Sequence, residues 1–343
     1  MGQMKCIFTV LFIFILKGLS PATQAFTQNV NKSPEKQKMR DIVSRRNLKL
    51  CSKKLFTLST EAPVDFAIVK FNESTNLLEP DDLEMDEVRL HLDGSELSFM
   101  GSRVQKNVTL IRCRSEREFG RNEPQVITEN SDSRSIEKQY LRNIVFRKNV
   151  ICDRFETNYR YNDNFLEESE KVNARNLYVH KPFQPEGIEP SEPSKTVAMW
   201  LKHMNPRFLR SVTVYMDDKN ITLADTENEL KCLDTLHVLR RSDIDDNILM
   251  NLKALDIELE PANITVNGIN HIVQKWATEE VPIGSRFVYY IDGPGYEITD
   301  IVKNVSGVTS VGQNRVIIRI LPDRFLKVWV DDFSVNIECF KKK

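Results

Sequence analysis

The sequence predicts a mainly β protein, built from two antiparallel, sandwich-like β-rich modules with a few short helices. Three observations lead to this prediction. Short runs in which apolar and polar residues alternate recur along the chain, as in half-buried strands. A proline-rich stretch, residues 181–195, divides these runs into two groups and has the composition of a semi-rigid linker. Helical periodicity is found at only two places.

The composition is that of a globular protein. The chain has 343 residues, of which 28% are charged and 41% hydrophobic, with 48 basic and 49 acidic side chains. These proportions exclude a wholly disordered chain, a coiled coil and a collagen-like fibre. The balanced charge argues against nucleic acid as the partner, because phosphate-binding domains usually carry a strong basic excess.

The N-terminus has the pattern of a secretory signal peptide, residues 1–25. A short basic region precedes the ten-residue, almost wholly apolar run 7–16, and Thr23 and Ala25 are small residues suited to signal peptidase. We therefore expect cleavage after Ala25 and a secreted product. An uncleaved anchor helix is the alternative, but the run is about half of the ~20 residues that span a bilayer.

Residues 26–56 are predicted to form a basic, flexible arm. Nine basic and two acidic residues lie between Lys32 and Lys54, whereas residues 61–96 hold eleven acidic and two basic ones. The arm is therefore a candidate contact for an anionic membrane surface or an acidic partner. The other interpretation is a solvated segment that folds back onto its own acidic neighbour.

The strands of the two predicted modules, residues 57–180 and 196–343, follow from the alternating runs. The clearest are 316–320, 325–330 and 333–339, which are joined by short polar turns and therefore predict an antiparallel meander. Phe333, Val335, Ile337 and Cys339 share the apolar face of the last run. The other strand-like runs are 64–71, 108–113, 144–152, 211–216 and 286–291.

Two short helices are predicted in the second module. Ser242 and Asp245 have the spacing of a capping box ahead of an apolar stretch. Residues 269, 272, 273 and 276 repeat at helical spacing and end on Trp276. Trp200 and Trp276 are each followed by an Arg-Phe pair and a strand-like run, which suggests a weak internal repeat or convergent β composition.

Five cysteines remain after signal cleavage, and a secreted protein favours disulfides. Leaving one cysteine unpaired allows fifteen two-disulfide patterns. We predict the pairs Cys113–Cys152 and Cys232–Cys339, each within one module, with Cys51 free or intermolecular. The alternative is five buried thiols.

Secretion also makes the Asn-X-Ser/Thr sequons candidate glycosylation sites. Pro34 weakens a sixth sequon at Asn31. The candidates are Asn72, Asn107, Asn220, Asn263 and Asn304.

The sequence contains no local catalytic or cofactor-binding signature. The five histidines are isolated, no two cysteines have zinc-ligand spacing, and no phosphate-binding loop or nucleophile elbow is present. We therefore predict a non-enzymatic protein without cofactor or metal. The alternatives are a secreted hydrolase with a dispersed Cys/His or carboxylate site, and a carbohydrate-binding ectodomain with Trp200 or Trp276 exposed on a sheet face.

One region resembles a known repeat. The segment Leu255-Asp256-Ile257, the aromatic run 288–296 and the run 301–305 resemble the FAINT repeat of the piroplasm parasites Babesia and Theileria, over about residues 255–311. Ser310-Val311 stands where that repeat usually has a Trp. The signal peptide and scattered cysteines are also similar to the spherical body proteins of Babesia. This resemblance implies a non-enzymatic effector, released from apical organelles into or onto the host erythrocyte, where it contacts a host or parasite protein.

Overall fold

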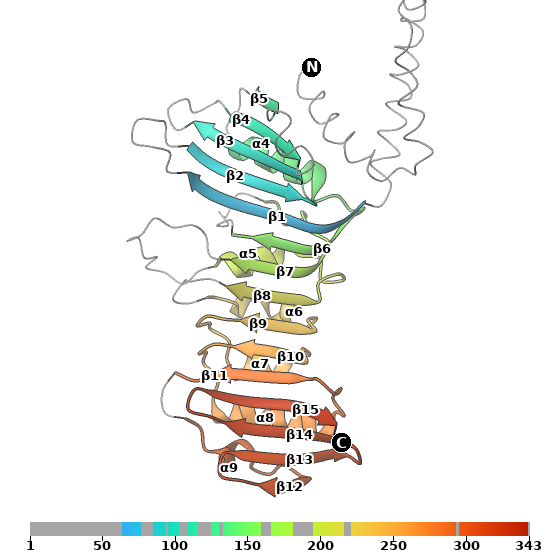
Figure 1. Ribbon diagram of the computed structural model, residues 1–343, viewed down its shortest axis with the longest axis vertical. Helices are drawn as coiled ribbons and strands as arrows, with labels where there is room; N and C mark the ends of the chain where they lie inside the picture. Colours follow the sequence, from blue (N-terminus) through green and yellow to red (C-terminus); the bar gives the residue numbers. More distant parts are fainter. Residues whose placement is uncertain are drawn as a thin grey trace, which may run out of the picture. The chain divides into compact units, whose positions relative to one another are not determined.

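The computed structural model describes ten stretches of the chain between residues 64 and 341 (Figure 1). The predicted signal peptide, its cleavage site at Ala25 and the basic arm 26–56 lie outside these stretches and stay predictions. The described residues are 64–76, 85–93, 95–102, 109–115, 125–129, 133–158, 166–180, 195–215, 221–292 and 295–341.

A single mixed sheet contains all of the described strands. Its fifteen strands lie in the order β12-β13-β14-β15-β11-β10-β9-β8-β7-β6-β1-β2-β3-β4-β5. The strand pairs are antiparallel among β1–β5 and among β11–β15, and parallel from β6 to β11. The predicted fold class, two antiparallel sandwich-like modules, is therefore wrong. The chain forms one α/β sheet with a central run of parallel strands.

The first five strands form an antiparallel meander, followed by helix α4 (Ser133–Ile144). Helix α4 packs on β3, where the rings of Phe99 and Tyr140 meet edge to face at 5.1 Å. The predicted strand 144–152 is wrong in its first half, because Ile144 ends this helix. The five strands are β1 (Val64–Asn76), β2 (Met85–Leu92), β3 (Ser95–Ser102), β4 (Thr109–Ser115) and β5 (Gln125–Glu129).

The next six strands are parallel, and each of the first five pairs with the strand that follows it in the sequence. The connections therefore always advance in the same direction along the sheet. Because such crossovers are right-handed, they all lie on the same face. The strands are β6 (Val150–Thr157), β7 (Ala174–His180), β8 (Ser211–Tyr215), β9 (Thr235–Val238), β10 (Asp256–Leu259) and β11 (Arg286–Tyr290).

Each connection between consecutive strands from β7 to β11 contains at least one helix. Figure 1 shows α5, α7 and α8 behind the sheet, with α8 behind β14 and β15. These strand–helix units form the central parallel part of the mixed sheet. The helices are α5 (Thr196–Lys202), the 3₁₀ turn η2 (Ala224–Thr226), α6 (Glu227–Leu230), α7 (Asp246–Asn251) and α8 (Val266–Thr278).

The C-terminal meander is confirmed. After β11 and the short helix α9 (Ile298–Ile301), four antiparallel strands follow, and β15 returns to pair with β11. One detail differs from the prediction: Phe333 lies before β15 and is 74% exposed, whereas Val335, Ile337 and Cys339 are buried. The strands are β12 (Val308–Val311), β13 (Arg315–Leu321), β14 (Arg324–Val330) and β15 (Ser334–Lys341).

The core lies between the parallel strands and their helices. Leu177, Val212, Leu236, Ile257 and Phe287 are neighbours across five strands, and each is at most 1% exposed. The residues between them along each strand belong to the other face and are mostly polar. Since the described helices of these connections lie on one face, the parallel strands keep the alternating pattern that is more typical of antiparallel sheets.

Helix α8 is confirmed, and its Ile269, Ile272, Val273 and Trp276 are buried as predicted. Helix α7 begins three residues later than the predicted capping box requires. Its cap is Asp245, whose carboxylate accepts a hydrogen bond from the Ile248 amide at 2.9 Å.

The predicted linker lies almost wholly outside the described residues, but the segments before and after it share one core. Trp200 on α5 packs against Phe71 on β1 and Phe155 on β6, with ring centroids 6.2 and 5.2 Å away. Trp200 on α5 and Trp276 on α8 are also equivalent in position, since each is a buried residue on a helix that precedes a parallel strand.

Candidate functional site

The face of the parallel strands opposite the helices is the candidate site, and we call it the open face. Strand register arranges its side chains in rows. One row crosses six strands as Glu156, Tyr178, Thr213, His237, Glu258 and Val288. Residues on either side of this row include Arg154, Asn176, His180, Ser211, Tyr215, Thr235, Asp256, Arg286 and Tyr290.

Four side chains at one end of the open face form what we call the aromatic stack. The guanidinium carbon of Arg154 lies 3.9 Å from the centroid of the Tyr178 ring. The Tyr178 ring is nearly parallel to that of His180, and His180 to that of Tyr215, with centroid distances of 6.4 and 6.1 Å. Tyr215 is 47% exposed. The stack therefore presents a rigid aromatic side chain to solvent at the end of a strand.

The surroundings of His180 favour the neutral form of its imidazole. Partial burial lowers its pKa below the ordinary value of 6.5, and the cations Arg154 and Lys70 lower it further, whereas the charge of Glu156 acts against them. A neutral imidazole stacks on tyrosine without the cost of desolvating a charge. Protonation would place a third cation beside Arg154 and Lys70.

Glu156 is the buried carboxylate of this region. Its side chain is 7% exposed and lies 2.9 Å from the Lys70 ammonium and 2.5 Å from Arg154 Nε. The pairing joins β1 to β6, which is the place where the antiparallel meander meets the parallel strands. A buried charge requires such partners, and we assign Glu156 a structural role that holds Arg154 over Tyr178.

The other end of the open face carries paired charges. Asp256 lies 3.2 Å from His237 Nε2. Glu258 accepts a hydrogen bond of 2.9 Å from the Tyr290 hydroxyl and lies 3.5 Å from Arg286, and its bond with Tyr290 raises the pKa of that phenol. These carboxylates and bases compensate each other, so the surface is polar without a strong charge of one sign.

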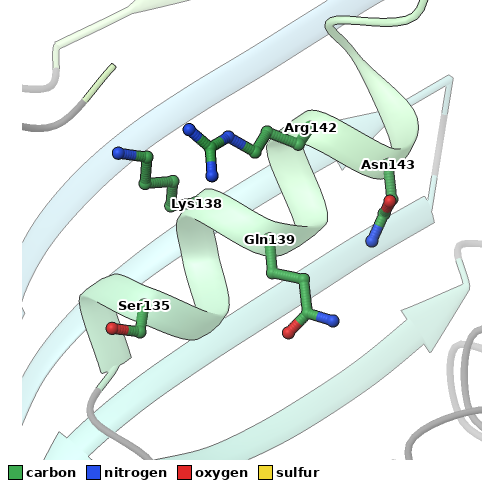
Figure 2. Close-up of a pocket in the computed structure, with 5 residues that line it drawn as sticks. All are labelled: Ser135, Lys138, Gln139, Arg142 and Asn143. Atoms are coloured by element: carbon green, nitrogen blue, oxygen red, sulfur yellow. The ribbon is translucent and has the colours of Figure 1, made fainter. Parts of the chain in front are cut away.

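A surface hollow lies away from the open face, along helix α4. It is lined by Ser135, Lys138, Gln139, Arg142 and Asn143, and Figure 2 shows all five side chains projecting from this helix. Arg142 is bound to Glu167 and Glu170, and its hydrogen bond with Glu170 raises its pKa. The hollow is a polar helix surface whose guanidinium is already paired.

Among the described residues, no three His, Cys, Asp or Glu side chains are placed to hold a metal ion. In the same part of the chain no helix is long and apolar enough to cross a membrane.

The cysteines are not brought together as disulfides in the described part of the structure. Cys152 and Cys339 are buried free thiols, and Cys232 is an exposed one. Cys152, which was the predicted partner of Cys113, and both members of the predicted pair Cys232–Cys339 are thus free, so neither predicted disulfide is formed in this structure. Cys51 lies outside the described residues, and its free or intermolecular state stays a prediction. Burial raises the pKa of Cys152 to about 12 and also raises that of Cys339. A nucleophilic cysteine needs the opposite shift.

The glycosylation candidates fall in different surroundings. Asn263 and Asn304 are exposed on the surface, and Asn72 is a partly exposed residue of β1. Asn107 and Asn220 lie outside the described residues.

The carbohydrate-binding alternative required Trp200 or Trp276 to be exposed on a sheet face. Trp200 is 0% exposed and Trp276 1%, and both belong to the helices that cover the sheet. Neither tryptophan can therefore contact a carbohydrate in the way that this alternative requires.

The open face was not recognised from the sequence. Tyr178 and His180 are two residues apart in a strand, and Tyr215 lies in the predicted strand 211–216, but the stack depends on the register of β7 with β8. No protein-family model, no curated protein and no solved structure matches this chain.

Proposed function

We propose that this chain is a non-enzymatic interaction protein that binds a protein partner with its open face, with the aromatic stack as the centre of the contact. The observation that supports this proposal most directly is the exposed Tyr215, held in a stack by His180, Tyr178 and Arg154. Tyrosine and arginine are the residues most enriched among those that dominate binding energy at protein interfaces.

The scaffold also suits binding. The parallel strands present one extended face, and side chains that are already held by their neighbours lose less freedom on binding. Beside the stack, the open face carries hydrogen-bonding groups such as His237 and Tyr290, which already contact Asp256 and Glu258.

The predicted signal peptide and the resemblance to FAINT-repeat proteins extend the proposal to location. The partner is then a protein outside the secreting cell, at or inside a host erythrocyte. This part of the proposal rests on the sequence.

Differential capture tests the binding proposal. We would immobilise the wild-type protein and the Tyr215→Ala variant and quantify the proteins each retains from an erythrocyte extract. Met250→Ala is the matched control, because Met250 is an exposed apolar residue on helix α7, on the covered side of the sheet.

We expect at least one protein to be retained equally by the wild type and Met250→Ala and about tenfold less by Tyr215→Ala, the loss that one interface anchor causes. If every retained protein is insensitive to Tyr215→Ala, or is lost equally with Met250→Ala, the open face is not the binding surface.

A further inference from the structure

The last strand of the sheet, β12, has an uncovered edge. It pairs with β13 on one side and ends the strand order on the other. All four of its residues are exposed, Val308 by 39% and Val311 by 64%. Natural edge strands are protected by charges, proline, bulges or a short length. The four-residue sequence Val-Thr-Ser-Val has a bulge but neither charge nor proline.

The two valines continue the apolar layer of the sheet. Val308 lies opposite Ile318 and Val311 opposite Val316, and the register shifts by a bulge between them. Cross-strand neighbours project to the same face, so both valines face the side on which Val316 and Ile318 are 0% exposed. The buried layer therefore ends at β12 with two valines in solvent.

We propose that β12 pairs with β12 of a second copy of this chain, antiparallel and about a twofold axis. This surface is separate from the open face, so the inference goes beyond the proposed function. A twofold axis generates an antiparallel strand pair, and the interface must then be complementary to itself.

The sequence of β12 meets this requirement because it is apolar, hydroxyl, hydroxyl, apolar, which is the same order in both directions. With the axis between Thr309 and Ser310, each valine lies opposite the other valine of the partner copy, and the two hydroxyl residues lie opposite each other. The apolar layer then continues from one copy into the next. A different partner strand has no reason to match this palindromic pattern.

Within β12 and β13, no charge opposes the pairing at short range. The nearest described cations on the neighbouring strand are Arg315 and Arg319 of β13. Two β13 strands would be separated by three strand spacings, about 14 Å. This exceeds the screening length of about 8 Å at physiological salt.

The expected dimer is weak, because a four-residue edge buries much less than the ~1,200 Å² of a stable interface. We would measure sedimentation equilibrium of the full chain from about 5 to about 500 µM, a range that covers micromolar dissociation constants. The average mass should rise from that of a monomer toward that of a dimer.

Val311→Lys places a charge in the pairing layer and should weaken dimerisation about tenfold or more, and Val308→Lys should act in the same way. Ile283→Lys is the control, since Ile283 is 52% exposed and lies outside β12. Circular dichroism verifies that each variant is folded. Hydrogen exchange of the β12 amides should slow as the concentration of the wild type increases.

A mass that stays monomeric over the whole range would overturn the proposal. So would a dimer that both lysine variants on β12 leave intact, or one that Ile283→Lys weakens as much. Loss of partner capture by Tyr215→Ala has no bearing on this result, so the two proposals fail independently.

Discussion

Replacing Trp200 by alanine tests whether one core joins the residues before and after 181–195. Trp200 is fully buried on α5 and contacts Phe71 and Phe155, which precede that stretch by many residues. Removing a buried tryptophan costs about 3–5 kcal/mol. The two aromatic contacts, at about 0.5–1.5 kcal/mol each, are part of that loss.

Urea unfolding followed by far-UV circular dichroism measures the total loss, and hydrogen exchange locates it. In a continuous sheet, Trp200→Ala should lower protection in β1 and β6 as well as in β7 and β8. Trp329→Ala is the matched control, since Trp329 is a partly exposed residue of β14 that packs under the Lys327 ammonium at 4.0 Å. It should cost no more than about 1 kcal/mol.

The reasoning fails if Trp200→Ala costs less than about 1 kcal/mol. It also fails if only residues after 195 lose protection, since two independent modules would behave in that way.

Three further predictions concern stability. Glu156→Gln should lower the free energy of unfolding in urea by about 1–2 kcal/mol, a limited loss because the cations that Glu156 pairs with are partly exposed and can be hydrated. An unchanged free energy would show that the buried ion pair does not stabilise the fold. Asp245→Ala should lower the free energy of unfolding by about 1 kcal/mol because it removes the cap of α7, whereas Asp245→Asn should keep most of that stability. Equal losses in the two variants would argue against the cap. Burial lowers the pKa values of His203 and His180 below 6.5 in the folded protein. As the pH falls, these histidines therefore take up protons more readily in the unfolded chain than in the folded one. Stability should therefore fall as the pH drops below about 6.5. The melting temperature between pH 7.5 and 5.5 measures this, and an unchanged slope in His203→Gln would contradict the assignment for His203.

Local sequence patterns were sufficient to predict those elements whose structure depends on residues close to one another in the sequence. The meander β13–β14–β15 was predictable because its strands are joined by turns of two or three residues, which leave antiparallel pairing as the only arrangement. Helix α8 was predictable because four apolar residues repeat at helical spacing over its length.

The same patterns were insufficient where an apolar run fits two structures. The run 144–152 contains the end of α4 and the start of β6, and alternation alone does not separate them. Likewise, the capping signal near Ser242 belongs to Asp245, because Ser242 is buried and the chain turns into α7 only after Asp245.

The sequence by itself located about half of the strands, among them β1, β8, β11 and the meander β13–β15, and it located α8. Only the tertiary structure decided that β6 to β11 are parallel and that one sheet continues across 181–195. The physical reason is that alternation records the burial of one face and carries no information on strand direction or neighbours. The aromatic stack and the open edge of β12 depend on that register, so both became visible only in the folded protein.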